Sequence, residues 1–161
     1  MATESRDTGY SDALSYAYDL LARRDYPAAA IGDKICSRGH SRDVSDAVVS
    51  KLREMGLVDD ESYGRRYVDY VTERKPQGRA KIVRDLQRKG LDDDLARRLV
   101  DEVIDLDSEV TMALDALQGR GASPSNIGDD PRIQARYYRF LKGRGFPDSV
   151  IRKTLRLLDE H

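Results

Sequence analysis

The side chains that could bind a partner in this chain are mostly cationic, and they recur at helical spacing in two segments. The first basic strip is Lys81, Arg84 and Arg88, and the second is Arg132, Arg136 and Arg139. Members of each strip lie three or four residues apart, so each strip forms one face of a helix, turned away from its apolar face. Such faces bind phosphates or acidic protein surfaces, although a merely solvated surface would carry the same residues.

Five more arginines extend the predicted binding surface. They are Arg65, Arg66, Arg144, Arg152 and Arg156. The net charge of the chain is only −1, but the charges are distributed in blocks. Residues 63–98 contain 11 basic and 6 acidic side chains, residues 131–158 contain 8 and 1, and residues 99–130 contain 1 and 8. Blocks of this kind indicate a polyanion or a charged protein as the partner.

Candidates for catalysis or metal binding are few. His40 follows a helix-ending glycine, where a partly buried structural side chain is the better interpretation, and His161 is terminal. Residues 92–94 are consecutive aspartates, which point in different directions on a helix and suit the positive end of its dipole better than a metal. The sequence has no phosphate-binding loop, nucleophile elbow, paired histidines or CxxC motif. We therefore expect no enzyme, no catalytic residue, no metal and no cofactor.

Composition indicates a reducing, aqueous compartment. Cys36 is the only cysteine, so an intramolecular disulfide is impossible. No apolar run approaches the length of a membrane span, and the first ten residues lack the hydrophobic segment of a signal peptide. The sequence predicts a cytoplasmic protein without a membrane partner.

An internal repeat organises the elements that carry these side chains. Its markers are Gly39, Gly90 and Gly145, each expected to end a helix in the left-handed conformation. Apolar residues stand eight and four residues before each glycine and five and thirteen after it: Ile31, Ile35, Val44 and Leu52; Ile82, Leu86, Leu95 and Val103; Tyr137, Leu141, Val150 and Leu158. The pattern predicts an all-α fold, an elongated, curved array of three tandem three-helix repeats, because one such unit alone is too small to be stable.

The predicted domain boundaries follow from this repeat. Residues 1–10 are expected to be a disordered tail, and Ser11 is expected to cap the first helix. The three repeats are predicted at residues 11–58, 59–106 and 107–161, the last with a flexible loop at 119–130 rich in glycine and proline.

The second repeat resembles a known family. The residues that carry the resemblance run from Asp60-Glu61-Ser62-Tyr63 through Tyr67-Val68, and then from Gly78 through Ile82 and Leu86 to Lys89-Gly90-Leu91. Leu141 with Arg144-Gly145-Phe146 is similar to a C-terminal signature of the same family, the bacterial RecX regulatory proteins. The chain departs from the family pattern at Pro27-Ala28-Ala29-Ala30, where Ser-x-x-Glu is frequent.

The resemblance implies a function and partners. It implies an inhibitor of RecA recombinase that binds the RecA–DNA filament, lodges in its helical groove, stops its growth and lowers its ATPase, strand-exchange and coprotease activities. The partners would be the RecA filament and single- or double-stranded DNA, and the protein would act as a monomer. Such a role belongs to the regulation of homologous recombination and the SOS response.

Two other interpretations remain open at this point. Tandem three-helix units also resemble helix-turn-helix modules, which would make the chain a sequence-specific DNA-binding protein. The acids Asp43, Asp46, Asp101 and Glu102 on the third helices oppose that interpretation, because they would repel phosphates beside a major groove. The second alternative is a passive helical scaffold for another protein.

Overall fold

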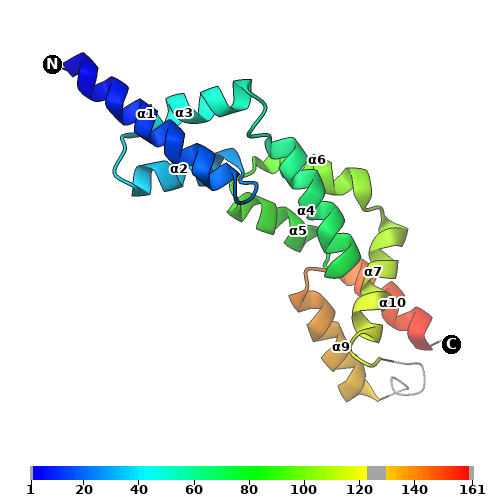
Figure 1. Ribbon diagram of the computed structural model, residues 1–161. Helices are drawn as coiled ribbons and strands as arrows, with labels where there is room; N and C mark the ends of the chain where they lie inside the picture. The colour runs from blue at the N-terminus through cyan, green and yellow to red at the C-terminus, as the bar shows by residue number, and fades with distance from the viewer. Residues whose placement is uncertain (1, 123–129, 160–161) are drawn as a thin grey trace. The chain divides into compact units, whose positions relative to one another are not determined.

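The computed structural model describes the backbone of residues 2–122 and 130–159, and within these ranges the side chains from residue 9 onward. The described residues form α-helices and turns without a β-strand (Figure 1). Within these described ranges the helices follow one another in three groups of three. They are α1 (Ala2–Leu21), α2 (Ala28–Ser37) and α3 (Arg42–Glu54); α4 (Asp60–Arg74), α5 (Arg79–Arg88) and α6 (Asp93–Val103); and α7 (Leu106–Gln118), α9 (Pro131–Gly143) and α10 (Asp148–Asp159). The predicted all-α class is confirmed.

Two compact units divide the chain. The first comprises Met1–Gly64 and Arg88–Asp92, and the second comprises Arg65–Gln87 and Asp93–His161. The repeat boundaries predicted after residues 58 and 106 lie within two residues of the starts of α4 and α7. The division between compact units instead falls inside α4, and it assigns the turn after α5 to the first unit. A three-helix repeat is therefore not the same as a compact unit.

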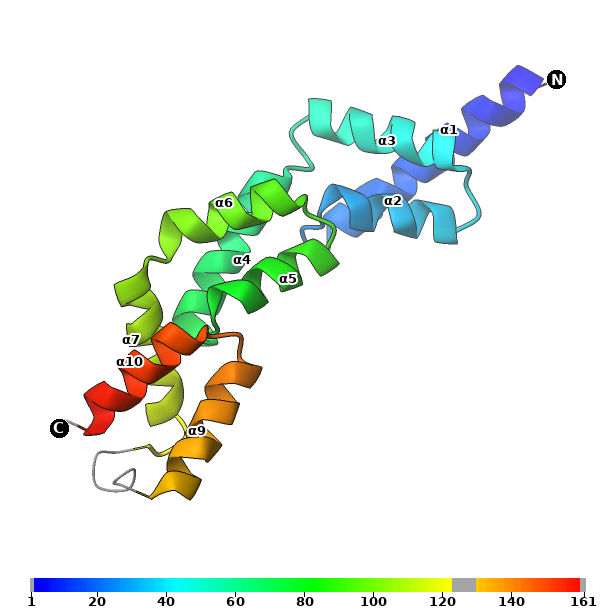
Figure 2. The ribbon, with the colours of Figure 1, turned by 180° about the vertical axis from the view of Figure 1, so that it is seen from behind.

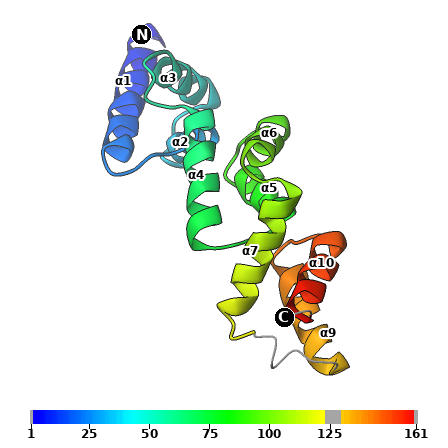
Figure 3. The ribbon, with the colours of Figure 1, turned by 90° about the vertical axis from the view of Figure 1, so that its right-hand side faces the viewer.

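The core of the first unit lies between α1, α2 and α3, which pack side by side (Figure 3). Ala13 and Ala17 are fully buried on α1, and their small side chains let the neighbouring helices approach closely. Ser45 on α3 is also fully buried, and its hydroxyl donates a hydrogen bond of 3.0 Å to the carbonyl oxygen of Gly32 on α2. The bond satisfies a polar group that would otherwise be costly to bury.

The core of the second unit includes α7, α9 and α10, with α10 packed against both of the others (Figure 2). The apolar residues predicted to face inward before each glycine are buried there: Ile82, Leu86, Tyr137 and Leu141. Val103 is an exception, because α6 ends at this residue and leaves it 42% exposed. The next residue, Ile104, is buried in its place.

The helix-ending glycines adopt the predicted conformation. The φ angles of Gly39, Gly90 and Gly145 are 102°, 97° and 85°. After Gly145 the backbone N–H of Phe146 donates to the carbonyl of Leu141 at 3.2 Å, which closes the end of α9. The repeat marker thus has the physical cause that the sequence indicated.

Each of two middle helices is capped by an acid from the following repeat. In the first unit the backbone N–H of Ala28, at the start of α2, donates to Asp60 Oδ1 at 2.8 Å. In the second unit the N–H of Arg79, at the start of α5, donates to Glu109 Oε1 at 2.9 Å. Glu109 is buried, and this desolvation raises the pKa of its carboxyl. Successive repeats are therefore joined by polar contacts.

Two sequence expectations differ from the structure, and a third falls mostly outside its described part. Helix α1 begins at Ala2, so residues 2–10 are helical where a disordered tail was expected, and Ser11 lies inside the helix instead of capping it. Residues 2–8 contain no glycine or proline that would end a helix. Of the predicted flexible loop at 119–130, residues 123–129 lie outside the described part of the chain.

His40 is partly buried as predicted, 13% exposed, with Nε2 3.2 Å from Asp12 Oδ2.

Candidate protein and nucleic-acid interface

Two of the predicted contact residues, Lys81 and Arg144, line one cavity in the second unit. Lys81 comes from the first turns of α5, and Arg144 follows α9. The cavity has a volume of about 470 Å³, and we call it the basic cavity, lined by Arg74, Lys75, Pro76, Gln77, Lys81 and Arg144. Figure 2 shows the turn between α9 and α10 beside the start of α5, as this lining requires.

Backbone contacts between two turns hold the basic cavity together. The N–H of Gly78 donates to the carbonyl oxygen of Arg144 at 2.9 Å. A Cβ atom on Gly78 would lie 2.1 Å from the carbonyl oxygen of Gly145, so only glycine allows this approach. Arg144 is also fixed through its side chain, because Nη1 donates to the carbonyl of Pro76 at 3.1 Å and the guanidinium lies 4.9 Å from the Phe140 ring centroid. Arg144 is therefore partly ordered before any ligand arrives.

Lys81 is the member of the cavity with a nearby acid. Its Nζ lies 3.2 Å from Asp85 Oδ2, one helical turn further along α5. The Tyr67 hydroxyl donates to the same carboxylate oxygen at 3.3 Å. Asp85 thus offsets one of the four positive charges around the cavity. Arg74 and Lys75 are exposed, and within the described residues neither forms an ion pair with a carboxylate.

Arg84 belongs to a different recess from Lys81. A groove of about 410 Å³ between α5 and α6 is lined by Arg79, Ala80, Val83, Arg84, Gln87, Arg97 and Asp101. Arg79 pairs with Asp101, and Arg97 pairs with Asp93 at 2.9 Å, which raises the pKa of the Arg97 guanidinium. Arg84 is exposed and has no ion pair among the described residues. Two members of the first basic strip, Lys81 and Arg84, therefore line two separate recesses, and Arg88 lines neither.

The arginines predicted on α9 and α10 are exposed, in agreement with a surface role. They are Arg132, Arg136, Arg139, Arg152 and Arg156. The Arg136 guanidinium lies 5.5 Å from the Tyr137 ring centroid, and Arg152 Nε donates to the carbonyl of Asp148 at 3.3 Å. Both side chains keep further donors for a partner.

Tyr138 is held by its own neighbours. Its hydroxyl donates to Asp148 Oδ1 at 2.6 Å, and Lys142 Nζ lies 2.6 Å from the same oxygen. The Lys142 ammonium and then the Tyr138 hydroxyl lower the pKa of the Asp148 carboxyl. Tyr138, Lys142 and Asp148 therefore form one polar cluster at the start of α10.

The remaining predicted residues lie on α4 and α5. Arg65 Nη1 donates to Glu102 Oε2 at 2.7 Å, and Arg98 pairs with the other oxygen of Glu102 at 3.1 Å. Arg66 and Arg88 are exposed. The structure therefore brings Lys81 and Arg144 together and places Arg65 in an ion-pair network on another part of the unit.

Sequence reasoning missed several basic residues of these recesses. They are Arg74 and Lys75 in the basic cavity, and Arg79 and Arg97 in the groove. The signal for the first pair was present, since two cations stand directly before the helix-breaking Pro76-Gln77-Gly78 turn. Their relation to Arg144 was invisible, because Arg144 belongs to another repeat.

Together the fold and its charges define a class of protein: tandem three-helix repeats whose second compact unit carries basic recesses. A family model described as RecX, second three-helix domain, matches residues 59–99. A regulatory protein RecX from Chlorobium phaeobacteroides is 32% identical over 150 residues, covering 92% of this chain and 95% of the relative. The corresponding protein from Thermus thermophilus is 33% identical over 150 residues, covering 93% and 94%.

A solved structure shares the fold. The crystal structure of RecX from Lactobacillus salivarius aligns with a TM-score of 0.82 at 22% identity, covering 96% of this chain and 99% of that one. Sequence similarity over nearly the full length settles the family. This chain belongs to the RecX family of regulatory proteins. None of its described helices is both long and apolar enough to cross a bilayer.

Proposed function

We propose that this chain is a negative regulator of RecA recombinase. It binds the RecA–DNA filament in its helical groove as a monomer, blocks extension of the filament, and lowers the ATPase, strand-exchange and coprotease activities. The observation that carries the proposal is the similarity to regulatory proteins named RecX over 92% and 93% of the chain. The site of action is the cytoplasm, where such filaments assemble on DNA.

The charge of the second compact unit supports a role for it in contact. Its exposed arginines on α5, α9 and α10 are Arg84, Arg132, Arg136, Arg139, Arg152 and Arg156. A nucleoprotein filament offers phosphates and acidic side chains to such residues, so the attraction is electrostatic and weakens with salt.

The ion pairs of α6 favour this function over sequence-specific DNA recognition. In a helix-turn-helix module the last helix of the unit enters the major groove. On α6, Arg97 is paired with Asp93 at 2.9 Å and Arg98 with Glu102 at 3.1 Å. These acids would be brought close to the phosphates that line the groove, at an electrostatic cost. We therefore place DNA-sequence reading second.

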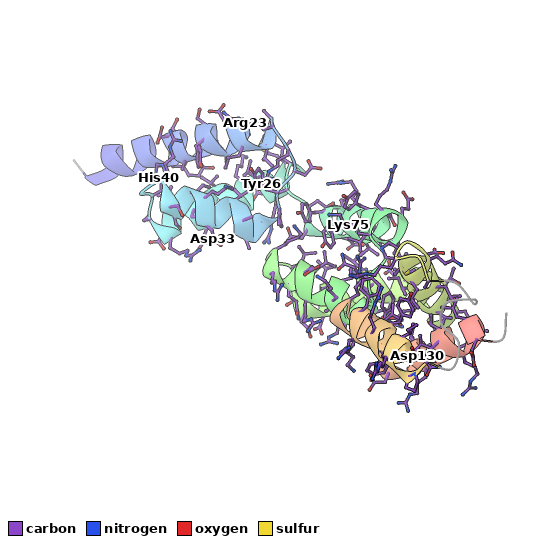
Figure 4. The ribbon with its side chains drawn as sticks, turned by 90° about the horizontal axis from the view of Figure 1, so that it is seen from below. Arg23, Tyr26, Asp33, His40, Lys75 and Asp130 are labelled. Atoms are coloured by element: carbon purple, nitrogen blue, oxygen red, sulfur yellow. The ribbon has the colours of Figure 1, made fainter. Side chains whose placement is uncertain are left out.

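The decisive experiment is the DNA-dependent ATPase of RecA with substoichiometric amounts of this protein added. A double variant, Arg84→Glu with Arg139→Glu, reverses two exposed charges of the second unit. A matched control, Arg23→Glu with Arg42→Glu, makes the same change in net charge in the first unit, where Arg23 lies at the end of α1 (Figure 4). Helicity by circular dichroism verifies that both variants fold.

The expected outcome is that wild type and control lower the ATPase rate and that the second-unit variant loses most of the inhibition. An unchanged ATPase rate with wild-type protein would overturn the proposal. Footprints at defined sequences would favour a DNA-sequence reader. Salt-insensitive binding to a partner protein, without an effect on DNA transactions, would favour a passive scaffold.

A further inference from the structure

We propose that the basic cavity binds the phosphate backbone of a single nucleic-acid strand. The proposal deepens the proposed function, since it names DNA, rather than the recombinase, as what this part of the surface touches. The proposal rests on the residues that line the cavity, and its test does not require RecA. It assigns a role to Arg74, Lys75 and Gln77, which the basic strips did not include.

The charge around the cavity calls for more than one anion. Two guanidinium and two ammonium groups line it, from Arg74, Lys75, Lys81 and Arg144, and Asp85 offsets one of them. A single carboxylate would leave most of this charge unmatched. A nucleic-acid strand brings successive phosphates, each of which releases counterions when a cation neutralises it. The arrangement therefore suits a polyanionic strand better than an isolated acidic side chain.

The size of the cavity limits how the strand can enter. Its volume of about 470 Å³ lies in the range of about 300–1,000 Å³ found for small-molecule sites and far exceeds that of one water, about 30 Å³. A phosphate can enter together with its attached sugar. A duplex is too broad to enter a recess of this volume, so the proposal is restricted to a single strand.

Arg144 is pre-organised to receive a phosphate. One of its N–H groups is used on the Pro76 carbonyl, and the guanidinium packs against Phe140. A guanidinium has five N–H donors, so others are available for phosphate oxygens, to which it can bind in a bidentate manner. Because the Gly78–Arg144 backbone bond fixes the same turn, little conformational freedom is lost on binding.

Gln77 provides a second, independent indication of a ligand. It lines the cavity, and its side-chain Oε1 is buried with no hydrogen-bond partner among the described residues. Buried polar atoms in proteins are nearly always paired, since an unpaired one costs about 1–3 kcal/mol. A base N–H beside the bound phosphate, such as N3–H of thymine, would donate to Oε1 once the Gln77 side chain turns toward the strand. If the amide is turned by 180°, its NH₂ group donates to the phosphate itself.

The test measures binding of a fluorescently labelled oligothymidylate by anisotropy, in the absence of RecA, at 50 and 200 mM NaCl. The test variant is Arg74→Gln with Lys75→Gln, two exposed side chains at the end of α4, where Figure 4 marks Lys75. The control variant is Arg23→Gln with Arg42→Gln, which makes the same change in net charge in the first unit.

The expected result follows from counterion release. Two fewer neutralised phosphates lower the salt slope by about 1.4, at about 0.7 per phosphate of a single strand. Over a fourfold rise in salt, wild type and control should then lose affinity about sevenfold more than the test variant. Arg144→Lys, which keeps the charge but loses the fork geometry, should also weaken binding, provided that circular dichroism shows it folded.

Three results would overturn the proposal: no binding of the oligonucleotide by wild type, equal losses in the test and control variants, or equal competition by polyglutamate of matched charge. The last would make the cavity a general acidic-peptide site. A test variant that loses oligonucleotide binding but still inhibits the RecA ATPase would support this site and show that it is distinct from the inhibitory contact. Wild type that binds the strand but does not inhibit RecA would overturn the proposed function alone.

Discussion

Replacing Gly78 with alanine should separate the two turns that form the basic cavity. A Cβ atom at this position would lie 2.1 Å from the carbonyl oxygen and 2.2 Å from the carbonyl carbon of Gly145. These are backbone atoms, so no side-chain rotation relieves the clash. The turns would have to part by about 1.2 Å to restore an ordinary carbon–oxygen contact of about 3.3 Å.

That displacement also breaks a hydrogen bond. The Gly78 N–H to Arg144 carbonyl distance would grow from 2.9 Å to about 4 Å, beyond hydrogen-bonding range. Overpacking costs about 1–3 kcal/mol, and a buried backbone group left unpaired costs about 1–3 kcal/mol. We therefore expect Gly78→Ala to lower the free energy of unfolding by about 2–6 kcal/mol. At an m-value of about 2 kcal/mol per molar, the urea midpoint falls by roughly 1–3 M.

A matched control lies two residues before Gly145. Gly143 is the last residue of α9, and a Cβ there would meet nothing within 4 Å. Gly143→Ala should therefore be neutral or stabilise the helix by up to about 1 kcal/mol. Urea unfolding followed by circular dichroism measures both variants. If Gly78→Ala unfolds at the same urea concentration as Gly143→Ala, the close approach of the two turns is refuted.

Two further predictions concern the acids that cap middle helices. Glu109→Gln keeps an acceptor for the Arg79 N–H but removes a buried charge. Because burial raises the folded-state pKa of Glu109, its stabilising contribution is full at low pH and is lost as the pH rises through that raised pKa. As the pH rises from 4 to 7, the melting temperature of Glu109→Gln should therefore rise relative to that of the wild type. A constant difference between the two would contradict this. Asp60→Ala removes the cap on Ala28 and should lower the free energy of unfolding in urea by about 0.5–2 kcal/mol. The control Asp33→Ala changes an exposed acid and should lower it by less than about 0.5 kcal/mol. Equal effects of the two variants would rule out the cap.

Much of the fold could be predicted because its causes are local. Left-handed glycines end helices wherever they occur, and an apolar period of 3.6 residues marks the buried face without reference to the rest of the chain. The predicted conformations of Gly39 and Gly145 and the burial of Ile82 and Leu141 are confirmed for this reason. The prediction that Val103 is buried was wrong because α6 ends there, and periodicity does not locate the end of a helix within a residue.

The candidate site could be predicted only in part. Charge and repeat position identified Lys81, Arg84 and Arg144 as separate candidates. Their grouping depends on which turn packs against which, and Lys81 shares its cavity with Arg144 while Arg84 faces α6. Pairing with an acid is likewise decided in space, as the contact between Arg65 and Glu102 shows.

The sequence by itself determined the helical class, the helix-ending glycines, the threefold repeat and the basic character of the later segments, since each depends on residues close together in the chain. Only the tertiary structure decided that Gly78 meets Gly145 and that a basic cavity forms around this contact. The physical reason is that backbone approach and side-chain pairing depend on how one repeat packs on the next. Residues more than sixty positions apart fix that packing jointly, and no single segment encodes it.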